Sequence, residues 1–180
     1  VQAFSSKELI NLTVAFSLCK KPKGNRVGII SSPGGFAVAT ADACERAGLS
    51  VPRLSEKTCK ELKKFLPRYS STLNPVDLTM TAVENPQFFP ECMKILDSDD
   101  KIDSMIVVTG ATGIYDEFIE KSVREIEKPV MVVLTPYWTV ETEPSASAKA
   151  GIPTYSYPED AAKSLAALTQ YAMVHSKNGH

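Results

Sequence analysis

The chain has 180 residues, 43% of them hydrophobic, which is the size and composition of one globular domain. Its 20 lysines and arginines nearly balance 21 acidic residues, so it lacks the broad positive field that gathers nucleic acid or an anionic membrane surface. No apolar run approaches the roughly 20 residues that span a bilayer, and no secretory pattern opens the sequence. We therefore expect a cytoplasmic protein with neither nucleic acid nor a membrane as partner.

Strand and helix patterns alternate along the chain. Short β-branched runs predict five strands, at 27–31, 49–54, 104–109, 129–135 and 152–157. Periodicity and capping residues predict helices at 6–19, 36–47, 55–65, 88–96, 116–127, 144–150 and 158–174, with 67–81 irregular. Because continuous apolar strands need cover on both faces, this order predicts an α/β fold, a doubly wound, flavodoxin-like parallel sheet of about five strands. We divide the chain into a lead-in helix and linker (1–24), the flavodoxin-like domain (25–176) and a polar tail (177–180).

The four cysteines are widely spaced and form no CxxC pair. They are Cys19, Cys44, Cys59 and Cys92. This spacing disfavours a zinc site or a redox dithiol and predicts reduced, mostly packed thiols.

The turn after the first predicted strand has the features of an anion site. Its candidate residues are Ser31, Ser32, Pro33, Gly34, Gly35 and Phe36. Gly34 and Gly35 allow backbone N–H groups to approach a ligand closely, Ser31 and Ser32 add hydroxyl donors, and the following helix points its positive end there. That helix carries no acid before Asp42, so nothing within its first turn opposes an anion. An ordinary strand-to-helix turn is the alternative reading.

A second glycine turn follows the third predicted strand. Its candidate residues are Gly110, Ala111, Thr112 and Gly113. Asp116 and Glu117 fall in the first turn of the next helix, where they would repel an incoming anion. On charge alone this is the poorer anion site, and a flexible connection is its alternative.

The motif NPVDLT at 74–79 adds a rigid turn and a carboxylate near the expected ligand edge. Asn74 and Asp77 are therefore further candidates. Asp77 is equally read as a turn former that accepts hydrogen bonds from nearby backbone. In the loop after the fourth strand, Tyr137 and Trp138 stand among polar residues, which fits either an interface or local packing.

Three of these segments, in this order, resemble one enzyme family. GNRVGIISSPGGFAVATADACERAGL at 24–49, LSEKTCKELKKFLP at 54–67 and NPVDLT are similar to the ADP-forming acyl-CoA synthetases, acetate-CoA ligases related to succinyl-CoA synthetase. The resemblance covers residues 7–168 and is to the C-terminal, flavodoxin-like CoA-ligase subdomain of the α portion. It implies a ligase that converts acyl-CoA, phosphate and ADP to acid, CoA and ATP through an acyl phosphate and a phosphohistidine.

The resemblance also implies the role of this subdomain. It would present a helix N-terminus to the phosphohistidine and join subunits, while an ATP-grasp module passes the phosphoryl group to ADP. CoA, ADP or ATP, phosphate and Mg would then be ligands of the complete enzyme, with none bound by this domain alone. The expected partners are the CoA-binding and phosphohistidine subdomains and the ATP-grasp module, in an oligomer.

Two departures from the family pattern matter. The family's Ser-His-Thr-Gly motif is absent, and the only histidines are His175 and His180 near the end of the sequence. The chain is therefore expected to contribute no catalytic residue and to be inactive alone. The second departure is that a glycine that often follows the GG pair is replaced by Phe36. In the related β subunit the phosphate-facing glycines follow the third strand, and this comparison favours Gly110 and Gly113 as the phosphate-binding turn.

Two rival functions stay open. One is a flavodoxin-like module for FMN or a nucleotide, with the first glycine turn around the phosphate and Trp138 beside the ring. The other is a structural domain of a fused protein acetyltransferase. Neither the acyl group nor the nucleotide follows from the sequence.

Overall fold

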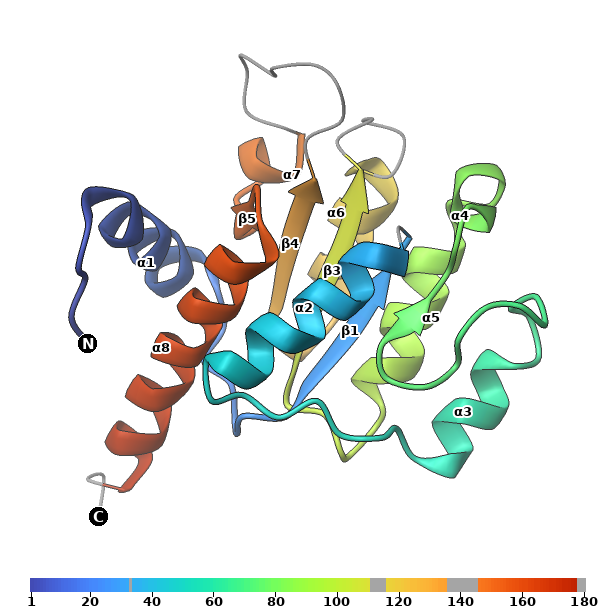
Figure 1. Cartoon of the computed structure of the whole chain (residues 1–180), viewed down its shortest axis with the longest axis horizontal. Coiled ribbons are helices and arrows are strands. Elements are labelled where there is room, and N and C mark those ends of the chain that lie inside the picture. Colours follow the sequence, from blue (N-terminus) through green and yellow to red (C-terminus); the bar gives the residue numbers. More distant parts are fainter. Residues whose placement is uncertain (33, 111–115, 136–145, 178–180) are drawn as a thin grey trace.

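Five parallel strands form one sheet in the order β2-β1-β3-β4-β5 (Figure 1). The computed structural model describes residues 1–32, 34–110, 116–135 and 146–177. The strands are β1 (Val27–Ser31), β2 (Val76–Asp77), β3 (Ser104–Gly110), β4 (Val130–Thr135) and β5 (Thr154–Tyr155). This order confirms the doubly wound, flavodoxin-like sheet.

Helices cover both faces of the sheet. They are α1 (Ser6–Leu18), α2 (Gly34–Arg46), α3 (Glu56–Leu62), α4 (Thr81–Glu84), α5 (Phe88–Asp97), α6 (Asp116–Glu125), α7 (Ala146–Lys149) and α8 (Pro158–Lys177). Side chains alternate across the sheet: Ile106 joins the core under α2 and α8, and Val107 the core under α5 and α6. Gly48 (φ 82°) and Gly151 (φ 77°) follow helices in the left-handed conformation that glycine accepts.

The predicted second strand, 49–54, is wrong. This segment makes only a single isolated parallel bridge, between Ser50 and Arg26, the residue before β1. The Asn74 side chain takes the next positions along β1: its Nδ2 donates to Val27 O (2.7 Å) and Pro52 O (3.0 Å), and its Oδ1 accepts from Ile29 N (2.9 Å). The second strand is instead β2, inside the stretch predicted as irregular, because it follows directly after Asn74 along the same edge of β1.

The predicted lead-in helix packs on the body of the domain. Leu12 and Ala15 of α1 are buried. Phe16 meets Tyr171 of α8 edge to face with ring centroids 5.3 Å apart, and Lys7 pairs with Asp160 at 2.7 Å. None of the helices in the described parts of the chain combines the length and apolarity needed to cross a membrane.

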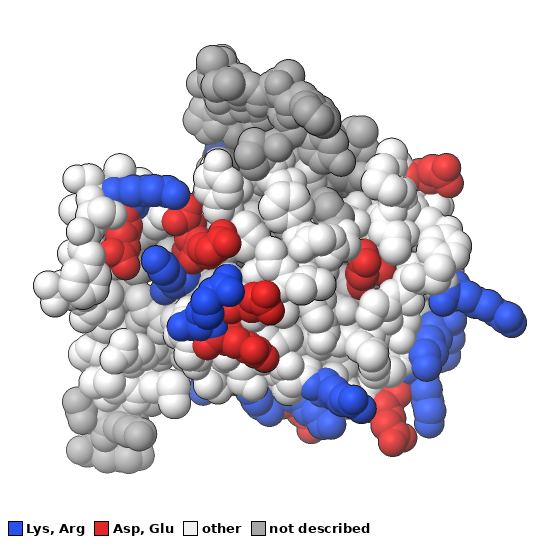
Figure 2. Space-filling model, viewed as in Figure 1, with Lys and Arg blue, Asp and Glu red and all other residues white. Residues whose placement is uncertain are grey.

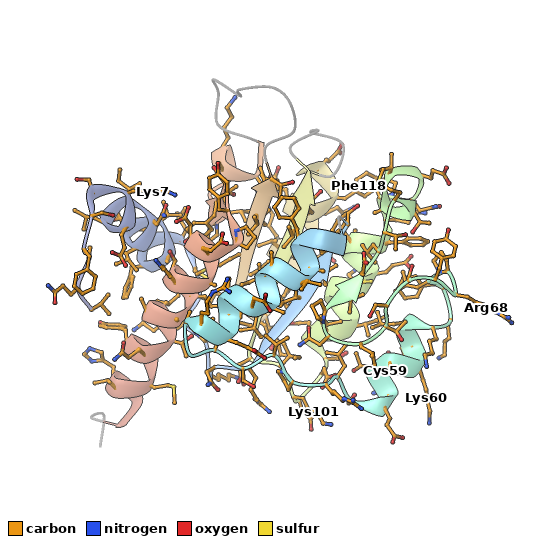
Figure 3. All side chains as sticks on the ribbon, viewed as in Figure 1. Lys7, Cys59, Lys60, Arg68, Lys101 and Phe118 are labelled. Atoms are coloured by element: carbon orange, nitrogen blue, oxygen red, sulfur yellow. The ribbon has the colours of Figure 1, made fainter. Side chains whose placement is uncertain are left out.

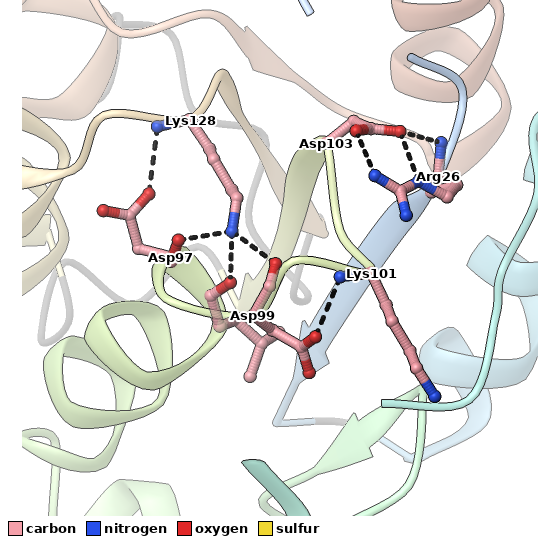
Figure 4. A network of polar contacts seen from close by, with 7 residues as sticks. Arg26, Asp97, Asp99, Lys101, Asp103 and Lys128 are labelled. Carbon is pink, nitrogen blue, oxygen red and sulfur yellow. Dashed lines mark hydrogen bonds and ion pairs between the residues drawn. The ribbon is translucent and has the colours of Figure 1, made fainter. Parts of the chain in front are cut away.

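Charged side chains hold together the amino-terminal end of the sheet, where the parallel strands begin (Figure 4). Asp103 accepts hydrogen bonds from Arg26 Nε (2.8 Å), Nη2 (2.7 Å) and backbone N (3.1 Å). Lys128 Nζ donates to the carbonyls of Leu96 (2.9 Å), Asp97 and Asp99 (2.7 Å), which end α5 and the turn after it. Burial lowers the pKa of Lys128. These contacts tie the starts of β1, β3 and β4 together.

Candidate functional site

The candidate site lies where the strand order reverses, between β1 and β3. In such sheets the crevice beyond the carboxyl ends of the strands is the usual ligand position. α2 begins within three residues of β1, so Gly34 and Gly35 form its first turn. The helix thus starts two residues earlier than the sequence predicted, with its N-terminus aimed at this edge (Figure 1).

Asp77 lies against the start of α2. The parallel register pairs it with Ser31, the last residue of β1. A Cβ atom placed on Gly34 would stand 2.6 Å from Asp77 Oδ2. The expectation that no acid opposes an anion at this helix is therefore wrong: the carboxylate comes from β2 rather than from the helix, and it already interacts with the helix dipole.

The two serines of the turn are structural. Ser31 is completely buried, and Ser32 is 5% exposed. Ser32 Oγ donates to Thr79 O (3.0 Å) and Ser32 N donates to Val108 O (3.1 Å), so this hydroxyl is not a free donor for a ligand, contrary to our expectation. Thr79, which the sequence reading missed, also donates its backbone N–H to Asp77 Oδ1 (2.8 Å) at a φ of 54°. It thereby fixes the carboxylate beside α2.

Gly35 forms the open side of the turn. It is exposed, and a Cβ atom there would meet none of the described residues within 4 Å. Phe36 is half-buried, and its carbonyl accepts from Thr40 Oγ1 at 2.6 Å. Large apolar side chains stand exposed nearby, Val38 (63%) on α2 and Met80 (66%) before α4. An exposed helix start with an apolar rim suits a docking surface better than an enclosed small-molecule pocket.

The second glycine turn belongs to the same edge. Gly110 is the last residue of β3, is buried and pairs with Thr135. Because β3 lies beside β1, with Ser31 in register with Val108, the two turns leave neighbouring strands. Ala111, Thr112 and Gly113, like Pro33, Tyr137 and Trp138, lie outside the described residues.

Asn74 is not a ligand group at this site. Both of its amide hydrogens and its amide oxygen bond backbone groups along β1 and at Pro52. Of the two candidates in NPVDLT, the structure brings Asp77 alone to the helix start.

Neither the thiols nor the described histidine completes a catalytic group here. All four cysteines are free, and burial raises the pKa of Cys19 and of Cys44 to about 12. His175 lies on α8 with its ring centroid 4.2 Å from that of Tyr171, near the end of the chain. Across the described part of the chain, His, Cys, Asp and Glu do not gather in groups of three that could hold a metal ion.

These features define an α/β module with a doubly wound parallel sheet and a helix N-terminus at the carboxyl edge of that sheet. Residues 27–177 match the Ligase-CoA domain model, and the chain belongs to that family. It is 35% identical over 174 residues to the acetate–CoA ligase (ADP-forming) II subunit alpha of Pyrococcus furiosus, covering 92% of this chain and 37% of that protein. It is 27% identical to the acetate–CoA ligase (ADP-forming) I of Archaeoglobus fulgidus, covering 98% of this chain and 25% of that protein.

A solved structure has the same fold. A crystal structure of a protein from Pyrococcus horikoshii OT3 superposes with a TM-score of 0.85 at 33% identity, over 95% of this chain and 41% of that one. The chain thus spans between 25% and 41% of the length of these relatives. The homologues are ADP-forming acyl-CoA synthetases, and this chain corresponds to their CoA-ligase domain.

Proposed function

We propose that this chain is the CoA-ligase module of an ADP-forming acyl-CoA synthetase. The complete enzyme would convert acyl-CoA, phosphate and ADP to acid, CoA and ATP. The module would present the N-terminus of α2 to a phosphohistidine carried by a neighbouring subdomain and would help to join the subunits. The observation that carries the proposal is the exposed first turn of α2, open at Gly35, in a member of the Ligase-CoA family.

The backbone of this turn supplies the chemistry that we propose. N–H groups at a helix start have no partner within the helix and donate to phosphoryl oxygens, with the helix dipole adding to the attraction. Since Asp77 occupies the Gly34 side, we place the phosphoryl group on the Gly35 side, with the β3 turn at Gly110 as its neighbour.

Asp77 would weaken the binding of any anion at this site, a phosphoryl group as well as free phosphate. Its charge lowers the affinity for inorganic phosphate. A phosphohistidine held on an adjoining subdomain arrives at high effective concentration, which compensates for weak intrinsic binding. The site would therefore release inorganic phosphate readily and bind the phosphoryl group only while the subdomain is docked.

Turnover requires the other modules. We propose that the CoA-binding and phosphohistidine subdomains and an ATP-grasp module supply the sites for CoA, the nucleotide and Mg, and that the assembly works in the cytoplasm, where CoA and ADP are available. Acyl-CoA, phosphate and ADP should give ATP with the complete protein and no ATP above buffer with residues 1–180 alone. ATP formation by the isolated chain, or none by the complete protein with any short acyl-CoA, would contradict the proposal.

The FMN alternative has less support. Flavin phosphate would meet the Asp77 carboxylate at the helix start, and a family of CoA ligases matches residues 27–177. Purified protein should therefore be colourless, and bound yellow flavin would revive the alternative.

A further inference from the structure

A group of basic side chains surrounds α3, which lies at the lower right of Figure 1, below the start of α2. We call it the α3 basic surface; it consists of Arg53, Lys57, Lys60, Lys63, Lys64, Arg68 and Lys101. All of these side chains are exposed. Figure 3 shows Lys60 and Arg68 projecting outward from α3 and the loop after it, with Lys101 at the adjacent lower edge. Figure 2 shows basic groups gathered along this side of the molecule.

The segment that carries most of this surface has an excess of positive charge. Segment 53–68 holds six of the 20 basic residues and two of the 21 acidic ones, so it carries +4 while the rest of the chain carries −5. The four ion pairs found in the described parts of the chain are Lys7–Asp160, Arg26–Asp103, Lys94–Glu125 and Arg124–Glu120. None of them uses a cation of the α3 basic surface.

The fold holds these cations outward. Lys57, Lys60 and Lys64 are spaced three and four residues apart, so they share one side of α3 and the turn after it. The opposite side is anchored: Thr58 and Leu62 are buried, and Phe65 packs on Phe88 of α5 with ring centroids 5.7 Å apart. Like charges are thus fixed in proximity, which disfavours the isolated domain unless an anionic partner compensates.

Asp99 joins Lys101 to this surface without neutralising it. Its carboxylate accepts hydrogen bonds from the backbone of Ser55 (2.9 Å), the cap of α3, and from Lys101 N (3.0 Å). Asp99 is 2% exposed, and its buried carboxylate is hydrogen-bonded to these backbone groups. The Lys101 side chain, in contrast, is exposed to solvent.

Apolar groups beside the cations indicate the class of partner. Tyr69 is 70% exposed and Leu73 is 54% exposed, in the loop that follows Arg68. Arg and Tyr are enriched in the centres of protein interfaces. Glu56 and Glu61 lie on the same helix as the lysines, where they would repel a uniform phosphate backbone but can pair with cations of a mixed protein surface.

We propose that the α3 basic surface docks onto a carboxylate-rich surface of another domain or subunit of the larger protein to which this chain belongs. This inference rests on the proposed function in one respect: we look for the partner among the other domains and subunits of that assembly. This contact is separate from the one at Gly35, so the module would be held from two sides.

Zero-length coupling of lysines to carboxylates in the complete protein, followed by peptide mass spectrometry, tests this contact. We expect Lys57, Lys60 or Lys64 to be linked to Asp or Glu outside residues 1–180, and these links to disappear in about 0.5 M NaCl, where screening removes exposed attractions. The pairs Lys7–Asp160 (2.7 Å) and Lys94–Glu125 (3.0 Å) are internal positive controls for the coupling.

A charge-reversal pair separates specific docking from general charge. In the variant Lys57→Glu with Lys60→Glu, the yield of cross-links from the remaining Lys64 should be at least fivefold lower than in the parent protein. Lys23→Glu with Lys121→Glu, an equal charge change at exposed positions elsewhere, should leave them intact. Both variants must keep the melting temperature of the parent protein, and Lys57→Gln with Lys60→Gln replaces the first pair if they do not.

Three results would overturn the inference: positive controls that couple while the α3 lysines do not, links only to a second copy of this chain, or binding of a 20-base-pair duplex that the α3 variant alone loses. ATP formation is measured on the same samples. Cross-links without ATP formation would refute the proposed function and support the docking surface. ATP formation without cross-links would support the proposed function and refute the docking surface.

Discussion

Replacing Gly35 by Asp tests the assignment of the α2 start directly. A Cβ at this position meets no residue of the described part of the chain within 4 Å, so the substitution displaces none of these neighbours. The new carboxylate stands at the first turn of α2, on the side that we assign to the phosphoryl group. Gly35→Ala introduces the same Cβ without the charge and is the matched control.

The two substitutions should separate stability from phosphoryl transfer. Ala in place of Gly within a helix gains about 0.5–1 kcal/mol, so Gly35→Ala should keep or raise the melting temperature. Asp adds about 0.3–1 kcal/mol from the helix dipole, partly cancelled by repulsion from Asp77, and should also fold. Loss of one charge-assisted contact to the phosphoryl group costs about 1.5–3 kcal/mol, a ten- to hundredfold fall in rate.

The assay is single-turnover phosphorylation of the histidine in the complete synthetase, measured beside thermal unfolding. We expect Gly35→Asp to lose ten- to hundredfold in rate with an unchanged melting temperature, and Gly35→Ala to stay within about threefold of the parent. If both variants lose rate equally, the turn acts through its shape. If neither loses rate and Gly113→Asp does, the site lies on the β3 turn and the assignment to α2 is wrong.

Three further predictions concern charge at the two ends of the sheet. Asp77→Asn should strengthen phosphate or sulfate binding by the chain about fivefold, since one nearby charge costs about 1 kcal/mol in water-like surroundings; unchanged affinity would place the anion elsewhere. Crystals grown in sulfate should hold the anion near Gly35 or Gly110, and well-ordered sulfate only at other positions would count against both turns. The Arg26 guanidinium holds the pKa of Asp103 below its ordinary value, so this pair stabilises the fold above about pH 4 and the stabilisation is lost as pH falls through the lowered pKa. Asp103→Asn should lower the free energy of unfolding by about 1.5 kcal/mol near neutrality, a low figure because the Arg26 side chain is 43% exposed. The difference in stability between the variant and the parent protein should shrink below about pH 4. A constant difference down to about pH 2 would refute this prediction.

The central strands were predictable because their signal is local. β1, β3 and β4 are buried along their whole length, and each contains a continuous apolar stretch that is typical of a strand covered on both faces. β1 ends at the predicted residue. Of the two edge strands, each two residues long, β5 lies within the predicted strand 152–157, whereas β2 lies in the stretch predicted as irregular.

The second strand was misplaced for a reason that is not local. Segment 49–54 has the composition of a strand, but its place beside β1 is taken by the side chain of Asn74, which bonds Ile29 across 45 positions of sequence. An amide side chain that substitutes for a strand leaves no periodic pattern. The NPVDLT motif marked the right segment for another reason, its resemblance to a family.

A contact between residues distant in sequence also determines the charge at the start of α2. The charge near a helix start was judged from the helix's own sequence, in which the first acid is Asp42. In a parallel sheet, however, every strand ends at the same edge, so the end of β2 supplies a carboxylate to the helix that follows β1. That edge also joins the two glycine turns, because β1 and β3 are neighbours in register. Gly35 follows β1 and Gly110 ends β3, so both belong to the site that we propose at this edge, and the Gly35 and Gly113 variants ask which of the two turns donates to the phosphoryl group.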